Sequence, residues 1–195
     1  MFHVLLCALA LWLPFSTPSQ KHRDHLNPQE ADLVREAQEI DRRTEVFLKI
    51  ADRRLKALEV LADPTKAEAP LPTDPKKAKK EQERRAEEAE KWGPPPTGTR
   101  AELLANYQHV IEELEDKLDD AFDRDPKNAL LNKAVGILKN GLEAEMNRLL
   151  LLRKSYGTSL TREEDRAMTT AYTIAQEALN GARTYLEQNP APKKQ

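Results

Sequence analysis

The stretch "TRAELLANYQHVIEELEDKLDDAFDRDP", residues 99–126, contains in one piece the pattern that decides the fold. Thr99 and Glu102 have the spacing of a capping box, which starts helices. Apolar side chains then recur every three or four positions, and Asp125-Pro126 ends the helix because a residue before proline disfavours helical backbone. The periodic residues are Leu103, Leu104, Tyr107, Val110, Ile111, Leu114, Leu118, Ala121 and Phe122. The stretch predicts one amphipathic helix with one buried face.

The same devices recur on both sides of this stretch. Upstream, Asn27 and Glu30 predict a capping box, and the apolar stripe that follows predicts one long helix over residues 27–62. Asp63-Pro64 ends this helix, so the amphipathic segment covers residues 27–63. Downstream, two further apolar stripes predict two helices that are separated by Gly157 and a capping box at Thr161 and Glu164.

Short connections decide how these helices are expected to assemble. The links near residue 125 and at 157–161 are short, and short links place consecutive helices antiparallel. Residues 99–189 therefore predict a three-helix antiparallel unit, and the long N-terminal helix 27–62 supplies a fourth. The chain has no alternating run of β-branched residues that would indicate strands. The sequence predicts an all-α, antiparallel helical bundle.

Residues 64–98 differ in character from the bundle segments. Proline-rich loops flank a charged helix that begins at Pro75 and has no apolar face, which is typical of a solvated spacer. Trp92 stands at the end of this helix and is the only tryptophan after the first 20 residues. We expect Trp92 either to pin the spacer to the bundle or to bind a partner.

The N-terminus predicts export. The first 20 residues contain no charged side chain, and the apolar run Val4–Leu13 has the length of a signal-peptide core but is too short to span a bilayer. Thr17 and Ser19 are small residues suited to cleavage before Gln20. We expect residues 1–19 to be a signal peptide, with an uncleaved anchor or a misassigned start codon as alternatives. The mature protein would be periplasmic or extracellular, without a stable membrane span.

Composition excludes several classes of partner and stabilisation. The chain has 195 residues, 33% of them charged, with a net charge of −2, so nucleic acid is not an expected partner. Its only cysteine, Cys7, lies in the predicted signal peptide, so the mature protein would have no disulfide and no thiolate metal site. Residues 20–26 and 190–195 are expected to be disordered.

Residues capable of catalysis or metal binding are few. His22 and His25 resemble a short metal-binding tract, but we interpret them as part of the disordered N-terminus. His109 is the only histidine within a predicted helix, whereas a di-iron bundle needs two Glu-x-x-His motifs. No nucleophile elbow, phosphate loop or zinc-protease motif is present in the sequence. We therefore predict no enzyme activity and no catalytic, cofactor-binding or metal-binding residue.

The strongest asymmetry of charge is an acidic run in the helix predicted within residues 99–126. Its acids crowd the C-terminal half of the helix, where the helix dipole disfavours negative charge. Two explanations remain open: pairing with basic residues of the helix 27–62, or a docking face for a basic partner or divalent cations. The predicted partner-binding acids are Glu112, Glu113, Asp116, Asp119, Asp120 and Asp123.

Four consecutive leucines, Leu149–Leu152, suggest a second association surface. Four consecutive residues point to every side of a helix, so at least one of them must lie outside a single narrow buried seam. They indicate either a wide core or an apolar patch for self-association or a partner. We assign Leu149, Leu151 and Trp92 to partner binding alongside the acids.

Together these features predict an exported, non-enzymatic helical bundle. We expect it to be a binding, scaffolding or oligomerising component of the cell envelope that acts by association of helix faces with a protein partner or with itself. The alternative is a periplasmic bundle that carries a ligand or metal.

Overall fold

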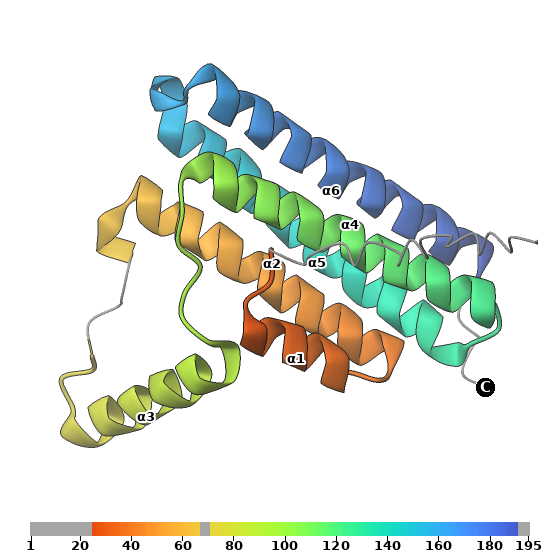
Figure 1. Ribbon diagram of the computed structural model, residues 1–195, viewed down its shortest axis with the longest axis horizontal. Coiled ribbons are helices and arrows are strands. Elements are labelled where there is room, and N and C mark those ends of the chain that lie inside the picture. Colours follow the sequence, from red (N-terminus) through yellow and green to blue (C-terminus); the bar gives the residue numbers. More distant parts are fainter. Residues whose placement is uncertain (1–24, 67–70, 191–195) are drawn as a thin grey trace, which may run out of the picture.

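The computed structural model describes residues 25–66 and 71–190. Within these ranges every regular element is helical, which confirms the predicted all-α class (Figure 1). The α-helices of the described residues are α1 (Pro28–Glu36), α2 (Ile40–Ala62), α3 (Pro75–Trp92), α4 (Arg100–Arg124), α5 (Ala129–Tyr156) and α6 (Arg162–Gln188). Short 3-10 turns, Pro64–Lys66 and Gly157–Ser159, follow α2 and α5.

The predicted capping boxes are formed. Asn27 Oδ1 accepts a hydrogen bond from the Glu30 amide at 2.8 Å, and the Asn27 amide donates to Glu30 Oε2 at 3.1 Å. The same reciprocal bonds join Thr99 with Glu102 and Thr161 with Glu164. Each box satisfies amide groups that have no partner inside the helix, which explains why these three helices begin where they do.

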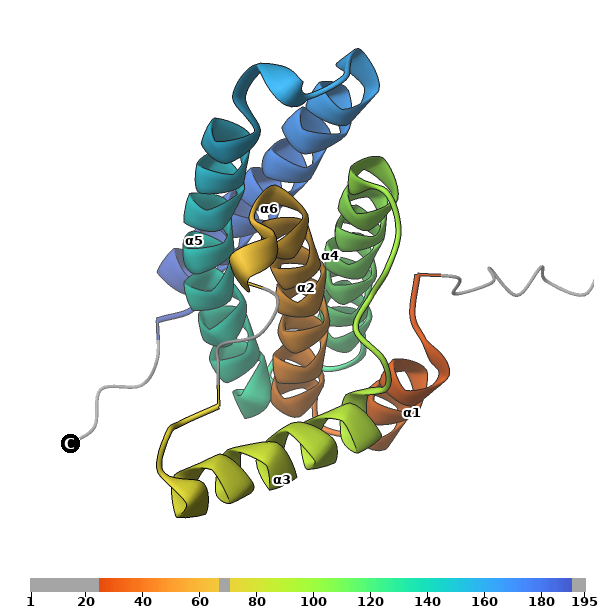
Figure 2. The same ribbon diagram turned by 90° about the vertical axis from the view of Figure 1, so that its left-hand side faces the viewer.

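Four helices, α2, α4, α5 and α6, lie side by side and form the bundle (Figures 1 and 2). The helix α2 packs against α4 and α5, and α6 packs against the same two helices from the other side. Consecutive helices run in opposite directions, but α4 and α5 lie diagonally and touch only sparsely. The close neighbours α2 and α5 therefore run parallel, as the pairs Asp41–Lys133 and Asp52–Arg148 show.

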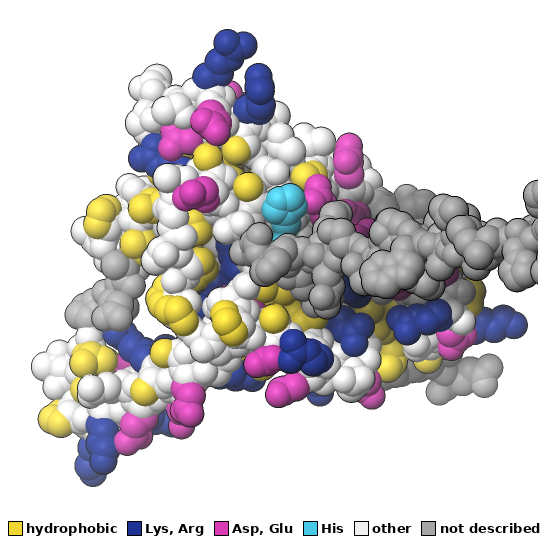
Figure 3. Space-filling model, in the orientation of Figure 1, with side chains coloured by type: hydrophobic (Ala, Val, Ile, Leu, Met, Phe, Trp, Pro, Cys, Tyr) yellow, Lys and Arg dark blue, Asp and Glu magenta, His cyan; other side chains and the backbone are white. Residues whose placement is uncertain are grey.

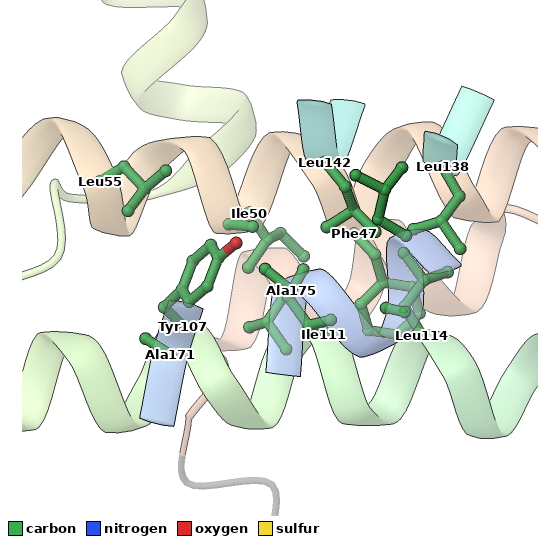
Figure 4. Close-up of a cluster of buried hydrophobic side chains, with 14 of the residues drawn as sticks. Phe47, Ile50, Leu55, Tyr107, Ile111, Leu114, Leu138, Leu142, Ala171 and Ala175 are labelled. Atoms are coloured by element: carbon green, nitrogen blue, oxygen red, sulfur yellow. The ribbon is translucent and has the colours of Figure 1, made fainter. Parts of the chain in front are cut away.

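The core forms where the apolar stripes of the four helices meet (Figure 4). Large side chains come from α2, α4 and α5, whereas α6 contributes mainly alanines, which allow its backbone to lie close to the others. Fully or almost fully buried residues of this cluster are Phe47, Ile50, Leu55, Tyr107, Ile111, Leu114, Leu138, Leu142, Ala171 and Ala175. Such burial is the main favourable contribution to the stability of the fold.

The prediction of one continuous helix over residues 27–62 is wrong, because the chain breaks after α1. The carboxylate of Glu30 is fully buried and lies 2.5 Å from Arg54 Nη1. In a continuous helix these residues would be ~36 Å apart. The chain must therefore turn between α1 and α2 so that α1 folds back beside α2 and Glu30 reaches its partner. Neither glycine nor proline marks the turn at residues 37–39, so the sequence carried no signal for it.

The helix α3 is the predicted charged helix, and it stands away from the bundle (Figure 2). It has no buried residue. Its side chains pair along its own length, as Arg84 does with Glu81 and Glu88 at 2.7 and 3.2 Å. Exposed pairs of this kind contribute only a few tenths of a kcal/mol each, so they support the helix without fixing its place.

Several predictions concern parts of the chain outside the described residues. The predicted signal peptide, residues 1–19, lies there, as do the metal-tract residue His22 and most of the tail 190–195. None of the helices described is both long enough and apolar enough to cross a bilayer.

Candidate partner-binding face

The predicted acids on α4 do not all have the same surroundings. Glu113 is largely covered, and His25 Nε2 lies 3.1 Å from its Oε2 atom. The other five, Glu112, Asp116, Asp119, Asp120 and Asp123, are exposed. Acidic side chains of the described residues are visible over α4 and α6 in Figure 3. The exposure of each residue shows that five of the six predicted acids remain available at the surface.

Local ion pairs neutralise only some of the predicted acids. Glu112 contacts His109 Nδ1 at 3.1 Å, and Asp120 lies 3.6 Å from Lys117 Nζ. No ion pair with another described residue involves Asp116, Asp119 or Asp123. We define these last three, which carry the uncompensated charge, as the acidic face.

Basic residues of α2 do not compensate the acids, contrary to the first of our two explanations. Arg54 binds the buried Glu30, and Arg53 lies 3.4 Å from the same carboxylate. The remaining basic groups of α2 have partners elsewhere. Arg42 binds Glu45, Arg43 binds the Ala37 carbonyl, Lys49 pairs with Asp52 and Glu88, and Lys56 pairs with Asp52. The acidic face is therefore left with solvent or a partner to balance it.

An apolar groove runs beside the acidic face, along the seam between α4 and α6. It encloses about 430 Å³. Residues of α5 form its floor, and Phe122, which is 42% exposed, meets Tyr185 edge to face at 6.1 Å. The lining residues are Glu115, Leu118, Asp119, Phe122, Leu131, Val135, Leu138, Ala178, Gly181, Ala182, Thr184, Tyr185 and Gln188. Its volume falls in the range of about 300–1,000 Å³ that is usual for binding pockets.

Glu115 joins the groove to the acidic face and was not among the predicted site residues. Burial raises the pKa of Glu115 to about 7, and the negative charges of Asp119 and Glu177 add to the shift. A mixture of protonated and ionised Glu115 is therefore present near neutral pH. The helical period could have identified it, because Glu115 lies between the seam residues Leu114 and Leu118.

His25 and Leu26 differ from the expectation of disorder for residues 20–26. Leu26 is buried, and the His25 ring lies beside the His109 ring, with 5.7 Å between centroids and 47° between the ring planes. Together with the Glu113 contact, these interactions fasten the start of α1 to α4. Within residues 25–66 and 71–190, no group of three or more His, Cys, Asp or Glu side chains is placed to hold a metal ion.

The leucine run divides between core and surface. Leu149 is 1% exposed and packs in the core, so it is not available to a partner as predicted. Leu151 is 63% exposed and Leu150 is 50% exposed. Leu150 borders a small pocket of about 160 Å³ together with Tyr172 and others. The 3.6-residue period explains the division, because adjacent residues differ by about 100° around the helix.

Trp92 pins α3 to the bundle, the first of the two roles that we expected. Asn27 Nδ2 donates to the Trp92 carbonyl at 3.0 Å, and the Arg53 guanidinium lies 5.9 Å from the Trp92 ring centroid. Arg53 also donates to the carbonyls of Gly93 and Pro94, at 3.0 and 2.6 Å. The end of α3 is thus held by α1 and α2 through its backbone.

Gly93 is required at this attachment. Its φ is +70°, and a Cβ atom there would lie 2.7 Å from Gln29 Oε1. We expect Gly93→Ala to lower the free energy of unfolding by about 1–2 kcal/mol and to speed amide hydrogen exchange at the end of α3. Gly157→Ala is the matched control, since its φ is +51° but a Cβ there meets no atom of residues 25–66 and 71–190 within 4 Å. Equal exchange at the end of α3 in the two variants would contradict this attachment.

A second site that sequence reasoning missed lies inside the bundle. Tyr107 donates its hydroxyl hydrogen to Glu145 Oε2 at 2.9 Å, and Glu145 is only 5% exposed. Burial raises the pKa of Glu145 to about 8. Nearby, Arg148 binds Asp52 at 2.6 Å and Glu59 at 2.7 Å. The spacing of Glu145 from Leu142 and Leu149 was the available signal, because it places an acid on the buried stripe.

Comparison with known proteins gives no relative: no family model, no curated protein and no solved structure matches this chain. Function is therefore inferred from the groove, the acidic face and the contacts around them.

Proposed function

We propose that this protein is an exported, non-enzymatic helical bundle that binds a protein partner in the cell envelope through a helix face. The observation that carries the proposal is the acidic face of α4. It lies beside an apolar groove, and the described basic residues of α2 form no ion pair with it because they bind other partners. Uncompensated charge of one sign steers a partner of the opposite sign and fixes its orientation, while apolar area supplies affinity.

Two features support a binding function over catalysis at this groove. Among the described residues that line it, the carboxylates are Glu115 and Asp119, and they lie four residues apart on the same wall. In most glycosidases, by comparison, the two catalytic carboxyl groups flank the bond that is cleaved. The remaining lining is mostly apolar, which suits contact with a hydrophobic surface.

Export is supported by the sequence alone. The apolar run Val4–Leu13 and the small residues Thr17 and Ser19 fit a protein that crosses a membrane by a cleaved signal. Sequencing the N-terminus of the protein from its native cells tests this. A mature chain that begins near Gln20 is expected, and one that retains Met1 would contradict it.

Neutralising the acidic face is expected to weaken partner binding. Envelope extract is passed over the mature protein and over Asp116→Asn/Asp119→Asn/Asp123→Asn, and the retained proteins are purified and titrated. We expect the variant to bind about tenfold more weakly and with less dependence on salt, since charged rims are screened by ions.

The control changes the same number of charges elsewhere. Glu83→Gln/Glu87→Gln/Glu90→Gln neutralises three exposed acids of α3 and should bind as the native protein does. Sedimentation of both variants reports whether the partner is a second copy of the chain. Equal affinities for the α3 and α4 variants would refute a function based on the acidic face.

A further inference from the structure

The groove between α4 and α6 has the length and form of a seat for a helix. Its lining on α6 extends from Ala178 to Gln188, which corresponds to ~15 Å of helix or roughly three turns. The groove is open at the surface along this seam, and its floor is formed by Leu131, Val135 and Leu138 of α5. An amphipathic helix binds such a groove through apolar side chains at intervals of three and four residues.

Acids border the groove from both helices. On α4, Glu115 and Asp119 line it directly. On α6, Glu177 is close enough to raise the pKa of Glu115 by repulsion. The charged groups that act on Glu115 are Asp119, Asp116 and Glu112 of α4 and Glu177 of α6, while the α5 floor is apolar. A cationic occupant would relieve this repulsion, whereas an anionic one would increase it.

Gly181 provides an independent reason to expect a close neighbour. Glycine within a helix costs about 1 kcal/mol relative to alanine. At Gly181 no contact among the described residues requires the missing side chain, since a Cβ atom would meet none of their atoms within 4 Å. Its position on the groove wall, beside Ala178 and Ala182, leaves a smooth strip against which another helix backbone can lie closely.

We infer that the groove between α4 and α6 binds an amphipathic helix of a partner protein, with its apolar stripe in the groove and its lysines or arginines against Glu115, Asp119 and Glu177. The inference rests on the proposed function and specifies the partner's chemistry. A helix fits better than a small cationic amphiphile because the groove spans several turns, and because acids lie at separate points along it, Glu115 and Asp119 in the α4 wall and Glu177 near Glu115 on α6.

Binding should depend on pH through Glu115. Its carboxyl ionises as the pH rises through its pKa of about 7, so a cationic helix should bind more tightly at about pH 8 than at about pH 6. Glu115→Gln, which cannot ionise, should remove most of this difference.

The test uses a labelled synthetic peptide of about 18 residues, with leucines on one face and lysines on the others. A second peptide has the same composition but a scrambled order without an apolar stripe. Fluorescence anisotropy measures the binding of both to the mature protein. The variants are Gly181→Met, which fills the groove, and Gly136→Met, a matched control on α5. A Cβ atom at Gly136 likewise meets nothing within 4 Å in the part of the chain that the structure describes. Circular dichroism checks that both fold.

We expect the striped peptide to bind the native protein and Gly136→Met equally, and Gly181→Met about tenfold more weakly. The scrambled peptide should bind weakly to all three. Equal binding of the striped peptide to both methionine variants would overturn the groove inference. The proposed function is tested separately, by the binding of the partner to Asp116→Asn/Asp119→Asn/Asp123→Asn. Tighter binding of monomeric dodecyltrimethylammonium than of the peptide, with the same loss in Gly181→Met, would overturn the inference in favour of a small ligand.

Discussion

Replacing Arg54 with methionine is expected to lower the free energy of unfolding by about 3–5 kcal/mol. Arg54 is 3% exposed and makes two bonds to Glu30, which is fully buried; its Nη2 atom also donates to the His25 carbonyl at 2.5 Å. Methionine fills similar space but leaves the Glu30 carboxylate in the interior without its main counter-charge. Denaturant unfolding measures the loss, and hydrogen exchange should show α1 opening first.

Two variants isolate the buried pair. Arg42→Met removes an arginine whose pair with Glu45 is exposed, and it should change stability by less than about 1 kcal/mol. Glu30→Leu/Arg54→Met removes both charges, and it should recover much of the loss because apolar residues can replace a buried ion pair. If Arg54→Met lowered the free energy of unfolding as little as Arg42→Met, this result would contradict a buried ion pair between Arg54 and Glu30.

The second large effect is a dependence of stability on pH caused by Glu145. Its pKa is raised from 4.5 to about 8 in the folded protein, chiefly by burial. Between these values the folded state holds a proton that the unfolded state releases, so stability must decrease as pH rises through this window. We expect the free energy of unfolding to fall by roughly 4 kcal/mol between about pH 5 and pH 9 through this group alone.

Glu145→Gln tests this directly. Glutamine keeps an oxygen that can accept the Tyr107 hydrogen bond but does not titrate, so the variant should be more stable than the native protein above about pH 8 and should lose most of the decline. Glu143→Gln is the control two residues away, because Glu143 is partly exposed and pairs with Arg183 at 2.9 Å. Parallel pH curves for the native protein and Glu145→Gln would contradict a protonated acid in the core.

Much of the local structure could be predicted because its causes are local. Capping boxes at Asn27, Thr99 and Thr161 involve residues three positions apart, so the sequence contains both partners of each bond. Apolar periodicity likewise identified the buried face of α4, where Leu103 to Ala121 behave as predicted. The acidic run was also visible, and five of its six assigned residues are exposed.

Contacts between distant residues account for what was missed. The bond from Arg54 to Glu30 joins residues 24 positions apart and requires the break between α1 and α2. The Tyr107–Glu145 pair joins two helices across the bundle. The groove depends on α4, α5 and α6 together, so Glu115 acquires its raised pKa only when their packing buries it, and the charges of Asp119 and of Glu177 on α6 add to the shift.

The sequence by itself determined that this protein is helical, where most of its helices begin and end, and which stripe of each is apolar. These properties follow from hydrogen bonds and side-chain spacing within single helices. Only the tertiary structure decided that α2 lies parallel to α5, that α4 and α5 lie on a diagonal, and which acids are covered. Those outcomes depend on how side-chain volumes and charges from separate helices fit together, which periodicity within one helix does not specify.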